Sequence, residues 1–434
     1  MFKYVVLFAS VMVSIQIVRE QGDALKADCH KRRKPALASL VDEVISWDAA
    51  WREHKKKTDA LRKQRNDLSE EINKIKKQGG DVSAILAKAK TIPQDIALIE
   101  KVQSDLSEKI QGALWRLPVI LDMAVPEGDN EKANVEVRRW GVPRTDEVIA
   151  HGDWAQQHNL ADFDQAAQVA GAGFNYLKEE LALLDISLQR YAIDVMRKHG
   201  FKLMEVPMML RSAAYERVVP LGDFEEVMYP AGDDAFMIAT AEHPLMSFFL
   251  NKTLDERELP VKLVGVSSCW RREIGSRGVD TKGLFRMHQF NKVEQVVIST
   301  PQESYTWFEK MQGITEEIMQ SLKIPYRVLE ICSGDISIKN AKQYDIEAFF
   351  PRQGKYAEIT SCSNCATWQA DRLGLKVKAG AEKFTPHTLN NTALATSRVM
   401  VAIMENFQNE DGTVNVPEVL QKYVGFKVMG KPIK

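Results

Sequence analysis

Apolar residues between about positions 36 and 118 recur at alternating spacings of four and three, which is the repeat of a helical coiled coil. The repeat falls into two stretches, Leu40–Ile75 and Ile85–Leu117, separated by Gln-Gly-Gly-Asp at 78–81. This pattern predicts an antiparallel hairpin of two long helices. A proline inside the second stretch, Pro93, predicts a kink or a break there.

The remainder of the chain has a different pattern. Residues 125–170 are rich in turn formers and are interpreted as a linker. From about residue 171, a long helical stretch is followed by strand-like runs, several of them without intervening helices, which favours a mostly antiparallel sheet. No P-loop or Gly-x-Gly-x-x-Gly pattern follows a strand. We expect an α+β fold with an N-terminal domain at 12–124, the linker, and a globular domain at 171–434.

The amino terminus begins with an apolar run, MFKYVVLFASVMVSIQIV, that could pass for a signal peptide. No convincing small-residue cleavage site follows, and the run is short for a bilayer span. The sequence from Met12 reads as a natural beginning, so we interpret residues 1–11 as an annotation artefact. No other apolar segment is long enough to be transmembrane. We therefore expect a cytoplasmic protein with no membrane partner.

Charge and cysteine content narrow the function classes. The net charge is -1 with 27% charged residues, so any RNA binding must come from a local patch. The five cysteines form an odd, sparse set in a chain of 434 residues, which indicates a reducing compartment and no disulfide framework. The first helix of the hairpin carries a local basic excess, which is either a solvated face or a rail for RNA phosphates. Its candidate residues are Lys55, Lys56, Lys57, Arg62, Lys63 and Arg65.

The segment Ser267–Phe290, SSCWRREIGSRGVDTKGLFRMHQF, places two arginines and a glutamate at the end of an apolar run. It predicts two strands joined by a Gly-rich loop. Charged residues beside such a hairpin are often only solvated. Arginines on a rigid strand are also suited to grip a polyphosphate, and these residues alone leave both interpretations open.

Three segments in order resemble the motifs of a class II aminoacyl-tRNA synthetase. GFKLMEVPMML, from Gly200, resembles motif 1, which lies at the dimer interface of such enzymes. Ser267–Phe290 resembles motif 2, with Arg271 and Glu273 as its Arg-x-Glu, and LNNTALATSRVMVAIMENFQ resembles motif 3, with its arginine at Arg398. The triplet Thr-Ala-Glu at 240–242 and EITSCSNC suggest serine specificity. The chain is therefore similar to the seryl-tRNA synthetase family over the hairpin, the linker and residues 171–425.

This resemblance implies an ATP- and Mg²⁺-dependent homodimer that joins L-serine to tRNA(Ser) through a seryl-adenylate, and that also serylates selenocysteine tRNA. Activation needs cations where charge accumulates rather than a general base. The implied ATP-binding residues are Arg271, Arg272, Glu273, Met287, Phe290, Glu358, Ile359, Thr360, Ser361 and Arg398. The implied serine-binding residues are Thr240, Ala241, Glu242, Arg271, Glu294, Asn390 and Thr392.

Within these sets the resemblance implies separate roles. Arg271, Glu273 and Arg398 are the expected catalytic residues: Arg271 for the α-phosphate and the substrate carboxylate, Arg398 for the γ-phosphate, and Glu273 near the adenine. Glu358 and Ser361 are expected to hold Mg²⁺ on the phosphates, because a hard cation prefers oxygen ligands.

Motif 3 departs from the family pattern in two places. Asn391-Thr392 and Ser397-Arg398 stand where many bacterial relatives have Gly-Ser and Gly-Arg, and the segment is closer to the archaeal branch. The extra bulk of Thr392 could narrow the serine pocket.

A Cys-x-x-Cys pair, Cys362 and Cys365, has the spacing of a zinc site. A structural zinc needs four ligands, and no second pair lies nearby in the sequence, so we expect no structural zinc. A methanogen type of the enzyme has a catalytic zinc, but the Thr-Ala-Glu triplet and the antiparallel hairpin favour the ordinary type.

Two other function classes stay open on the sequence. An amino-acid:carrier-protein ligase has the same catalytic core but lacks a tRNA-binding arm, whereas this chain has a long helical hairpin. A non-catalytic RNA-binding paralogue predicts loss of motif residues. The residues whose loss would indicate it, Arg271, Glu273, Glu294, Glu358 and Arg398, are all present.

Overall fold

The computed structural model describes residues 15–220, 225–273 and 283–432. They fall into two compact units, one ending at Pro118 and one beginning at Val119. The expected start at Met12 and most of the loop expected inside motif 2 lie outside the described residues. No helix in the described ranges is long and apolar enough to cross a membrane.

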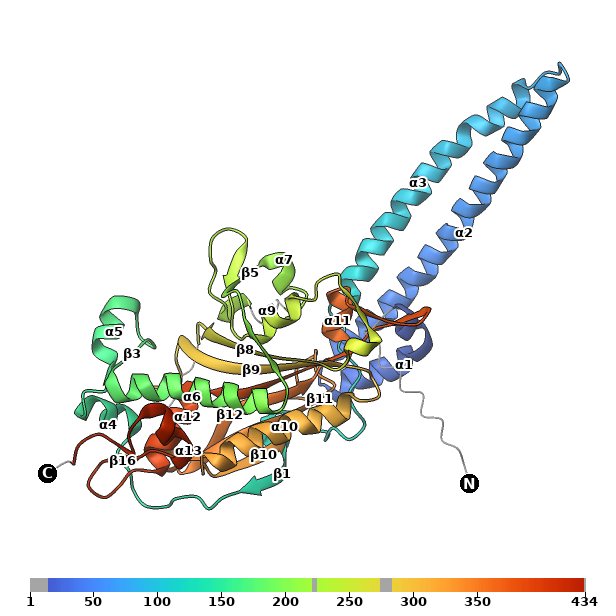
Figure 1. The fold of residues 1–434 in the computed structure, drawn as a ribbon. Helices are drawn as coiled ribbons and strands as arrows, with labels where there is room; N and C mark the ends of the chain where they lie inside the picture. Colours follow the sequence, from blue (N-terminus) through green and yellow to red (C-terminus); the bar gives the residue numbers. More distant parts are fainter. Residues whose placement is uncertain (1–14, 221–224, 274–282, 433–434) are drawn as a thin grey trace, which may run out of the picture. The chain divides into compact units, whose positions relative to one another are not determined.

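The first unit is an antiparallel helical hairpin preceded by a shorter helix (Figure 1). Helix α1 spans Ile15–Lys31, α2 spans Pro35–Lys77 and α3 spans Ser83–Leu114, and α2 packs against α3. The turn between them includes Gly79 with a φ of 70°, a conformation that glycine adopts without strain. Helix α3 continues through Pro93, so the helix is not broken there.

The second unit is built on an eight-stranded sheet with the order β1-β10-β11-β12-β15-β9-β8-β4. All neighbouring strands are antiparallel except β4 and β8, which confirms the predicted α+β fold. The strands are β1 Val135–Trp140, β4 Lys202–Glu205, β8 Val261–Trp270, β9 Gln289–Ser299, β10 Tyr326–Glu330, β11 Lys342–Phe350, β12 Lys355–Asn364 and β15 His387–Ala395.

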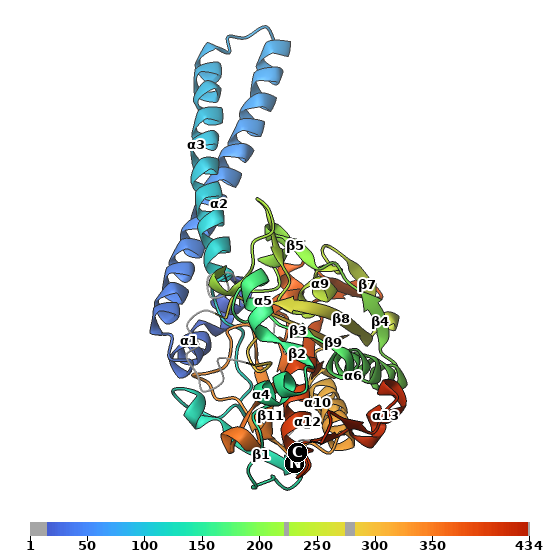
Figure 2. The ribbon, with the colours of Figure 1, turned by 90° about the vertical axis from the view of Figure 1, so that its left-hand side faces the viewer.

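Two layers cover the sheet. Helices α6 (Glu179–Lys198), α10 (Ser304–Ser321) and α12 (Thr396–Asn406) pack on one face, whereas α7 (Ser212–Tyr215), α9 (Glu242–Ser247) and α11 (Trp368–Arg372) belong to a smaller layer on the other (Figures 1 and 2). The remaining elements are α13 Glu418–Val424, β2 Ala161–Asp162, β3 Tyr176–Leu177, β5 Met209–Arg211, β6 Ala235–Met237, β7 Thr253–Asp255, β13 Lys376–Ala379, β14 Glu382–Phe384, β16 Val414–Asn415 and β17 Val428–Met429.

Residues 125–170, interpreted above as a linker, are instead part of the second unit. Strand β1 pairs with β10 at the edge of the sheet, and α4 (His151–Gln157) and α5 (Phe163–Ala170) follow it. The indole of Trp154 on α4 is fully buried and donates a 2.6 Å hydrogen bond to the carbonyl of Gly412. These elements are short and β1 is largely exposed, so they leave a weak hydrophobic pattern that the turn formers obscure.

Candidate active site

The side chains of β9 alternate between the two faces of the sheet. Val293 and Val297 pack into the core beneath α6, α10 and α12. Phe290, Lys292 and Glu294 alternate with them and therefore point to the opposite face. Strand β8 pairs with β9 in register and ends beside Arg271, whose backbone N–H donates a 2.9 Å hydrogen bond to the carbonyl of His288.

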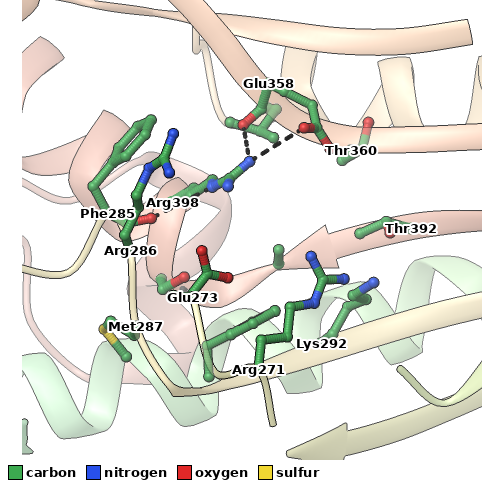
Figure 3. A pocket seen from close by; sticks show the side chains of 14 residues that line it. Arg271, Glu273, Phe285, Arg286, Met287, Lys292, Glu358, Thr360, Thr392 and Arg398 are labelled. Atoms are coloured by element: carbon green, nitrogen blue, oxygen red, sulfur yellow. Dashed lines mark hydrogen bonds and ion pairs between the residues drawn. The ribbon is translucent and has the colours of Figure 1, made fainter. Parts of the chain in front are cut away.

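A pocket opens on this face of the sheet (Figure 3). The ends of β8, β9, β12 and β15, the start of α12 and the segment 283–288 contribute to it. Its lining residues are Arg271, Glu273, Phe285, Arg286, Met287, Phe290, Lys292, Glu358, Ile359, Thr360, Thr392, Ala395, Ser397 and Arg398. The structure thus brings the expected ATP residues together except Arg272 and Ser361, which do not line the pocket.

The two motif arginines have different surroundings. Arg398 donates a 2.6 Å hydrogen bond from Nη1 to the carbonyl of Glu358, and its guanidinium lies 5.2 Å from the ring of Phe285. Arg271 forms no ion pair with any described residue, and its buried Nε has no hydrogen-bond partner among them. The guanidinium of Arg271 lies 5.4 Å from the ring of Phe290. A half-buried guanidinium with no ion-pair partner among the described residues is a place where an anion gains from binding.

A second polar cluster joins β9 and β15. Thr392 donates a 3.1 Å hydrogen bond to Oε2 of Glu294, and Nζ of Lys292 lies 3.4 Å from the same oxygen. Burial raises the pKa of Glu294; Lys292 opposes this, and the negative charge of Glu242 adds to it. Asn390, on the same face of β15, is buried and donates to Sγ of Cys365 at 3.4 Å. The cluster therefore combines a buried carboxylate with a hydroxyl donor.

The Thr-Ala-Glu triplet leads into α9, with Glu242 buried at 5% exposure. Oε1 of Glu242 receives two hydrogen bonds of 2.6 Å, from Nζ of Lys339 and from Nε2 of Gln369. Burial opposes ionisation, but Lys339 and the amide of Gln369 outweigh it and lower the pKa of Glu242. Neither partner was predicted, because each lies in a loop or short helix far along the chain with no motif around it.

Glu358 and Ser361 are three residues apart on β12 and would point to opposite faces of a regular strand. The register of β12 against β11 shifts between Thr360 and Glu358, which leaves Ile359 as the extra residue of a β-bulge. Ile359 and Cys362 both belong to the core on the helical side. The bulge therefore returns Glu358 and Ser361 to the same face, as a shared cation site would require.

Asp345 adds a further acid at this point, which sequence reasoning missed. It lies opposite Ser361 in the register of β11 and β12 and accepts a 3.0 Å hydrogen bond from Gln343. Burial and the charge of Glu358 raise the pKa of Asp345 to about 8, against the hydrogen bonds from Gln343 and Ser361. Two neighbouring carboxyl groups and a hydroxyl are oxygen donors of the kind that Mg²⁺ prefers.

The Cys-x-x-Cys pair is fully buried. The thiol of Cys365 donates to Oδ1 of Asn340 at 3.3 Å, and burial raises its pKa to about 12. Burial also raises the pKa of Cys362. Over the described ranges no group of three or more His, Cys, Asp or Glu side chains is placed to hold a metal ion. The absence of a structural zinc stays a prediction.

The basic residues of the helical hairpin divide into two groups. Lys55 pairs with Asp59 at 3.0 Å, Lys57 with Glu53 at 2.6 Å and Arg62 with Glu100 at 2.6 Å. Lys56, Lys63 and Arg65 are exposed, and their side chains have no acidic partner in the part of the chain that the structure describes. The sequence did not distinguish the two groups, because pairing depends on which helix face each residue occupies.

The antiparallel sheet and its arginine-lined pocket define a class of enzyme. The model of the tRNA synthetase class II core domain (G, H, P, S and T) matches residues 226–407, so the second unit is a class II aminoacyl-tRNA synthetase core. The model of the seryl-tRNA synthetase N-terminal domain matches residues 12–121. The chain belongs to the seryl-tRNA synthetase family, which confirms the predicted family.

Individual relatives agree with this assignment over nearly the whole chain. A serine–tRNA ligase of the archaeon Methanocella arvoryzae is 46% identical over 419 residues, covering 95% of this chain and 99% of the relative. The crystal structure of seryl-tRNA synthetase from Pyrococcus horikoshii complexed with ATP has a TM-score of 0.93 at 41% identity, covering 98% of this chain and 100% of that one. The cytoplasmic serine–tRNA ligase of Naegleria fowleri in complex with AMP has a TM-score of 0.88 at 34% identity, covering 96% and 99%.

Proposed function

We propose that this protein joins L-serine to tRNA(Ser) in two steps, forming seryl-adenylate from serine and ATP and then transferring the seryl group to the terminal ribose. The observation that carries the proposal is the pair of arginines in one pocket. Arg271 has no ion-pair partner among the described residues, and Arg398 lies on the opposite side of the same pocket (Figure 3). Family membership and the ATP and AMP complexes of the two solved relatives support it.

In the first step, a carboxylate oxygen of serine attacks the α-phosphorus of ATP, and the bond to pyrophosphate breaks with its electron pair leaving on pyrophosphate. The carboxylate is already ionised, so no general base is required. Arg271 neutralises the charge that develops on the α-phosphate, and Arg398 binds the γ-phosphate. Phe290 stacks on the adenine, Met287 lines its pocket, and Glu273 contacts it.

Mg²⁺ belongs to the proposal as the cation on the ATP phosphates. Glu358 and Ser361 would hold it, and Asp345 adds a third oxygen donor whose pKa is raised by burial and by the neighbouring charge of Glu358. When bound, the ion supplies positive charge to the phosphates. The protein's own part is to hold these oxygens on one face through the bulge at Ile359.

Serine is selected by the buried cluster of Glu294 and Thr392. The substrate hydroxyl donates to Glu294, which is 2% exposed. Alanine has no hydroxyl to donate, so its binding would leave the buried carboxylate of Glu294 without this hydrogen bond. The affinity for alanine is therefore lower than for serine. The methyl group of Thr392 limits the space beside the hydroxyl and opposes the larger side chain of threonine.

The helical hairpin is the proposed binding arm for tRNA. Its exposed lysines and arginines contact phosphates and ribose of the long variable arm and read shape rather than sequence. For the same reason the proposal includes selenocysteine tRNA as a second substrate, which aminoacylation of that purified tRNA tests. The arm also favours a tRNA ligase over an amino-acid:carrier-protein ligase.

A homodimer and a cytoplasmic location complete the proposal. The motif 1 segment exposes Leu203, Met208 and Met209, which are 49%, 37% and 53% exposed and provide apolar surface for a second copy. Sedimentation at micromolar concentration should give a mass of about twice 49.1 kDa. The cysteines are all free, which fits a reducing compartment.

The test is exchange of labelled pyrophosphate into ATP, with serine, threonine, alanine, glycine and cysteine added in turn. We expect exchange that depends on serine and falls at least about a hundredfold in Arg271→Ala. Arg138→Ala, which removes an exposed arginine paired with Glu309 and Glu316, is the matched control. No exchange with any of the amino acids by the intact protein would reject the proposal.

A further inference from the structure

Among the described residues, the carboxylate of Glu242 is hydrogen-bonded through only one of its two oxygens. Both of its side-chain hydrogen bonds, from Lys339 and Gln369, fall on Oε1, and no other described residue donates to the carboxylate. Gln369 is itself fixed, because its Oε1 accepts a 2.8 Å hydrogen bond from Thr388. The carboxylate is thus fixed in orientation while its second oxygen, Oε2, stays available.

Lys339 is an unusual partner for this position. It comes from the loop between β10 and β11, and its side chain is only 12% exposed. Burying an ammonium group costs free energy unless a carboxylate compensates it, and Glu242 is the acid that does so. The pair is therefore a fixed feature of the site rather than a surface ion pair.

Charges around Glu242 explain why a lysine is needed there. Glu294 on β9 is close enough for the two carboxylates to repel each other electrostatically. Lys292 lies 3.4 Å from Glu294, and Lys339 lies 2.6 Å from Glu242, so each acid has its own cation. His243 and Arg271 are the other ionisable neighbours on this face, and Cys365 lies beside Lys339. Without Lys339, the buried carboxylates of Glu242 and Glu294 would have only one nearby lysine among the described residues, Lys292, between them.

We infer that Lys339, together with Gln369, is a positioning residue for the substrate: it fixes Glu242 through Oε1 so that Oε2 can accept a hydrogen bond from the α-ammonium group of serine. The inference rests on the proposed function and extends it to residues outside the family motifs. Lys339 acts through Glu242 and does not touch the substrate. Its loss should therefore weaken serine binding and leave ATP binding intact.

The experiment compares Lys339→Met, Lys339→Arg and Gln369→Ala in the exchange reaction, with serine and ATP varied separately. We expect Lys339→Met to raise the serine KM at least about tenfold and to change the ATP KM less than about threefold. Lys339→Arg keeps the charge and should recover most of the loss. Gln369→Ala removes a donor but no charge, so its effect on the serine KM should be of the same kind and smaller.

Lys342→Met is the matched control. Lys342 is 11% exposed and pairs with Glu330 at 2.8 Å, so its removal also breaks a largely buried ion pair, but one that does not involve Glu242. The serine KM of this variant should equal that of the wild type. In addition, Lys339→Met combined with Glu242→Gln should have a serine KM no higher than Glu242→Gln alone, because both changes act on one carboxylate.

The outcomes distinguish failure of the proposed function from failure of the inference about Lys339. Wild-type protein without serine-dependent exchange overturns the proposed function and this inference with it. Serine-dependent exchange by the wild type, with an unchanged serine KM in Lys339→Met, overturns only the inference. Equal rises of the serine and ATP KM values, with a fall in melting temperature matched by Lys342→Met, also overturn it, since Lys339 would then be only structural.

Discussion

Nε2 of His151 accepts a 3.2 Å hydrogen bond from the backbone N–H of Leu284. The other ring nitrogen, Nδ1, lies 3.0 Å from the carboxylate of Glu405 on α12, so the ring is the tautomer with its proton on Nδ1. The histidine is 1% exposed, and it connects the first turn of α4 and helix α12 to the segment 283–288 of motif 2. Phe285, Arg286 and Met287 follow Leu284 directly and line the pocket.

Removing this anchor should impair ATP binding more than serine binding. In His151→Ala we expect the ATP KM of the exchange reaction to rise about tenfold, because the segment that lines the adenine side loses its fixed start. The free energy of unfolding should fall by about 2–3 kcal/mol, since Glu405 and the Leu284 N–H lose a buried partner.

The control for this prediction is His199→Ala, which removes an exposed histidine that lies 2.8 Å from Glu317. It should change neither the ATP KM nor the melting temperature by a measurable amount. Gly283→Ala disturbs the contact between His151 and the segment 283–288 without changing the histidine, because a Cβ at position 283 would lie 2.2 Å from Nε2 of His151. An ATP KM that stays at the wild-type value in both His151→Ala and Gly283→Ala would contradict the anchoring role.

The sequence was sufficient to predict the helical hairpin and most of the expected ATP-binding residues that line the pocket. A coiled coil repeats its apolar positions locally, so the periodicity of Leu40–Ile75 predicts it directly. Arg271, Phe290, Glu358 and Arg398 stand in short ordered motifs, and the fold places them around one pocket. The resemblance to these motifs was enough to identify them, although they come from different elements, with Phe290 on β9, Glu358 on β12 and Arg398 on α12.

The partners of these residues could not be predicted. His151, Lys339, Gln369 and Asp345 contact the site through loops, short helices and a cross-strand pair, and a contact of this kind depends on register and packing rather than on local pattern. The bulge at Ile359 is a clear case. Nothing in the local sequence marks an extra residue there, yet it decides that Glu358 and Ser361 share a face.

Thr392 should set discrimination against threonine. Thr392→Ser keeps the hydroxyl that donates to Glu294 at 3.1 Å and removes one methyl group from the pocket. The serine KM should change less than about threefold, whereas the preference for serine over threonine in kcat/KM should fall about tenfold, because one methyl group less leaves room for the larger substrate.

Thr392→Val makes the complementary change, because it keeps the bulk and removes the donor. Here the serine KM should rise about tenfold, since Glu294 loses a hydrogen bond that holds its carboxylate. Thr413→Ser, at a buried position whose hydroxyl donates a 2.6 Å hydrogen bond to Oδ1 of Asp411, serves as the control for a lost methyl group. Equal discrimination in wild type and Thr392→Ser would exclude Thr392 as a size filter.

The binding of tRNA by the helical hairpin should depend most on the basic side chains that have no acidic partner among the described residues. We expect the triple variant Lys56→Ala, Lys63→Ala, Arg65→Ala to raise the tRNA KM at least about tenfold while serine-dependent exchange stays unchanged, because each lost phosphate contact weakens binding without touching the pocket. The slope of log KM for tRNA against the logarithm of the salt concentration should also decrease, by the equivalent of up to about three phosphate contacts.

The matched variant removes the three paired cations, Lys55, Lys57 and Arg62, and carries the same change in net charge. Its tRNA KM should rise less, since these side chains already interact with Asp59, Glu53 and Glu100. A larger effect from the paired set than from the unpaired set would show that the ion pairs of the free arm open when tRNA binds.

Acid should destabilise the second unit through His243. Its ring is 3% exposed, and Nδ1 lies 2.8 Å from the hydroxyl of Tyr215. Burial lowers the pKa of His243 to about 3, with Lys339, Lys292 and Arg271 adding to the effect and Glu242 opposing it. The unfolded chain, with an ordinary histidine pKa of about 6.5, binds a proton as the pH falls below that value while the folded protein does not. Stability is therefore full above about pH 6.5 and is lost below it, by about 1.4 kcal/mol per pH unit.

The difference between wild type and His243→Gln isolates this contribution, because other titrating groups such as Asp345 are common to both. Glutamine can still bond Tyr215 but does not titrate. Between pH 7.5 and 5, the wild type should lose about 2 kcal/mol more unfolding free energy than the variant, measured by urea denaturation at each pH. His199→Gln, at the exposed pair with Glu317, should follow the wild-type profile. Parallel pH profiles for wild type and His243→Gln would mean that His243 is protonated equally in the folded and unfolded states, and that the lysine-rich surroundings of the serine site do not hold it neutral.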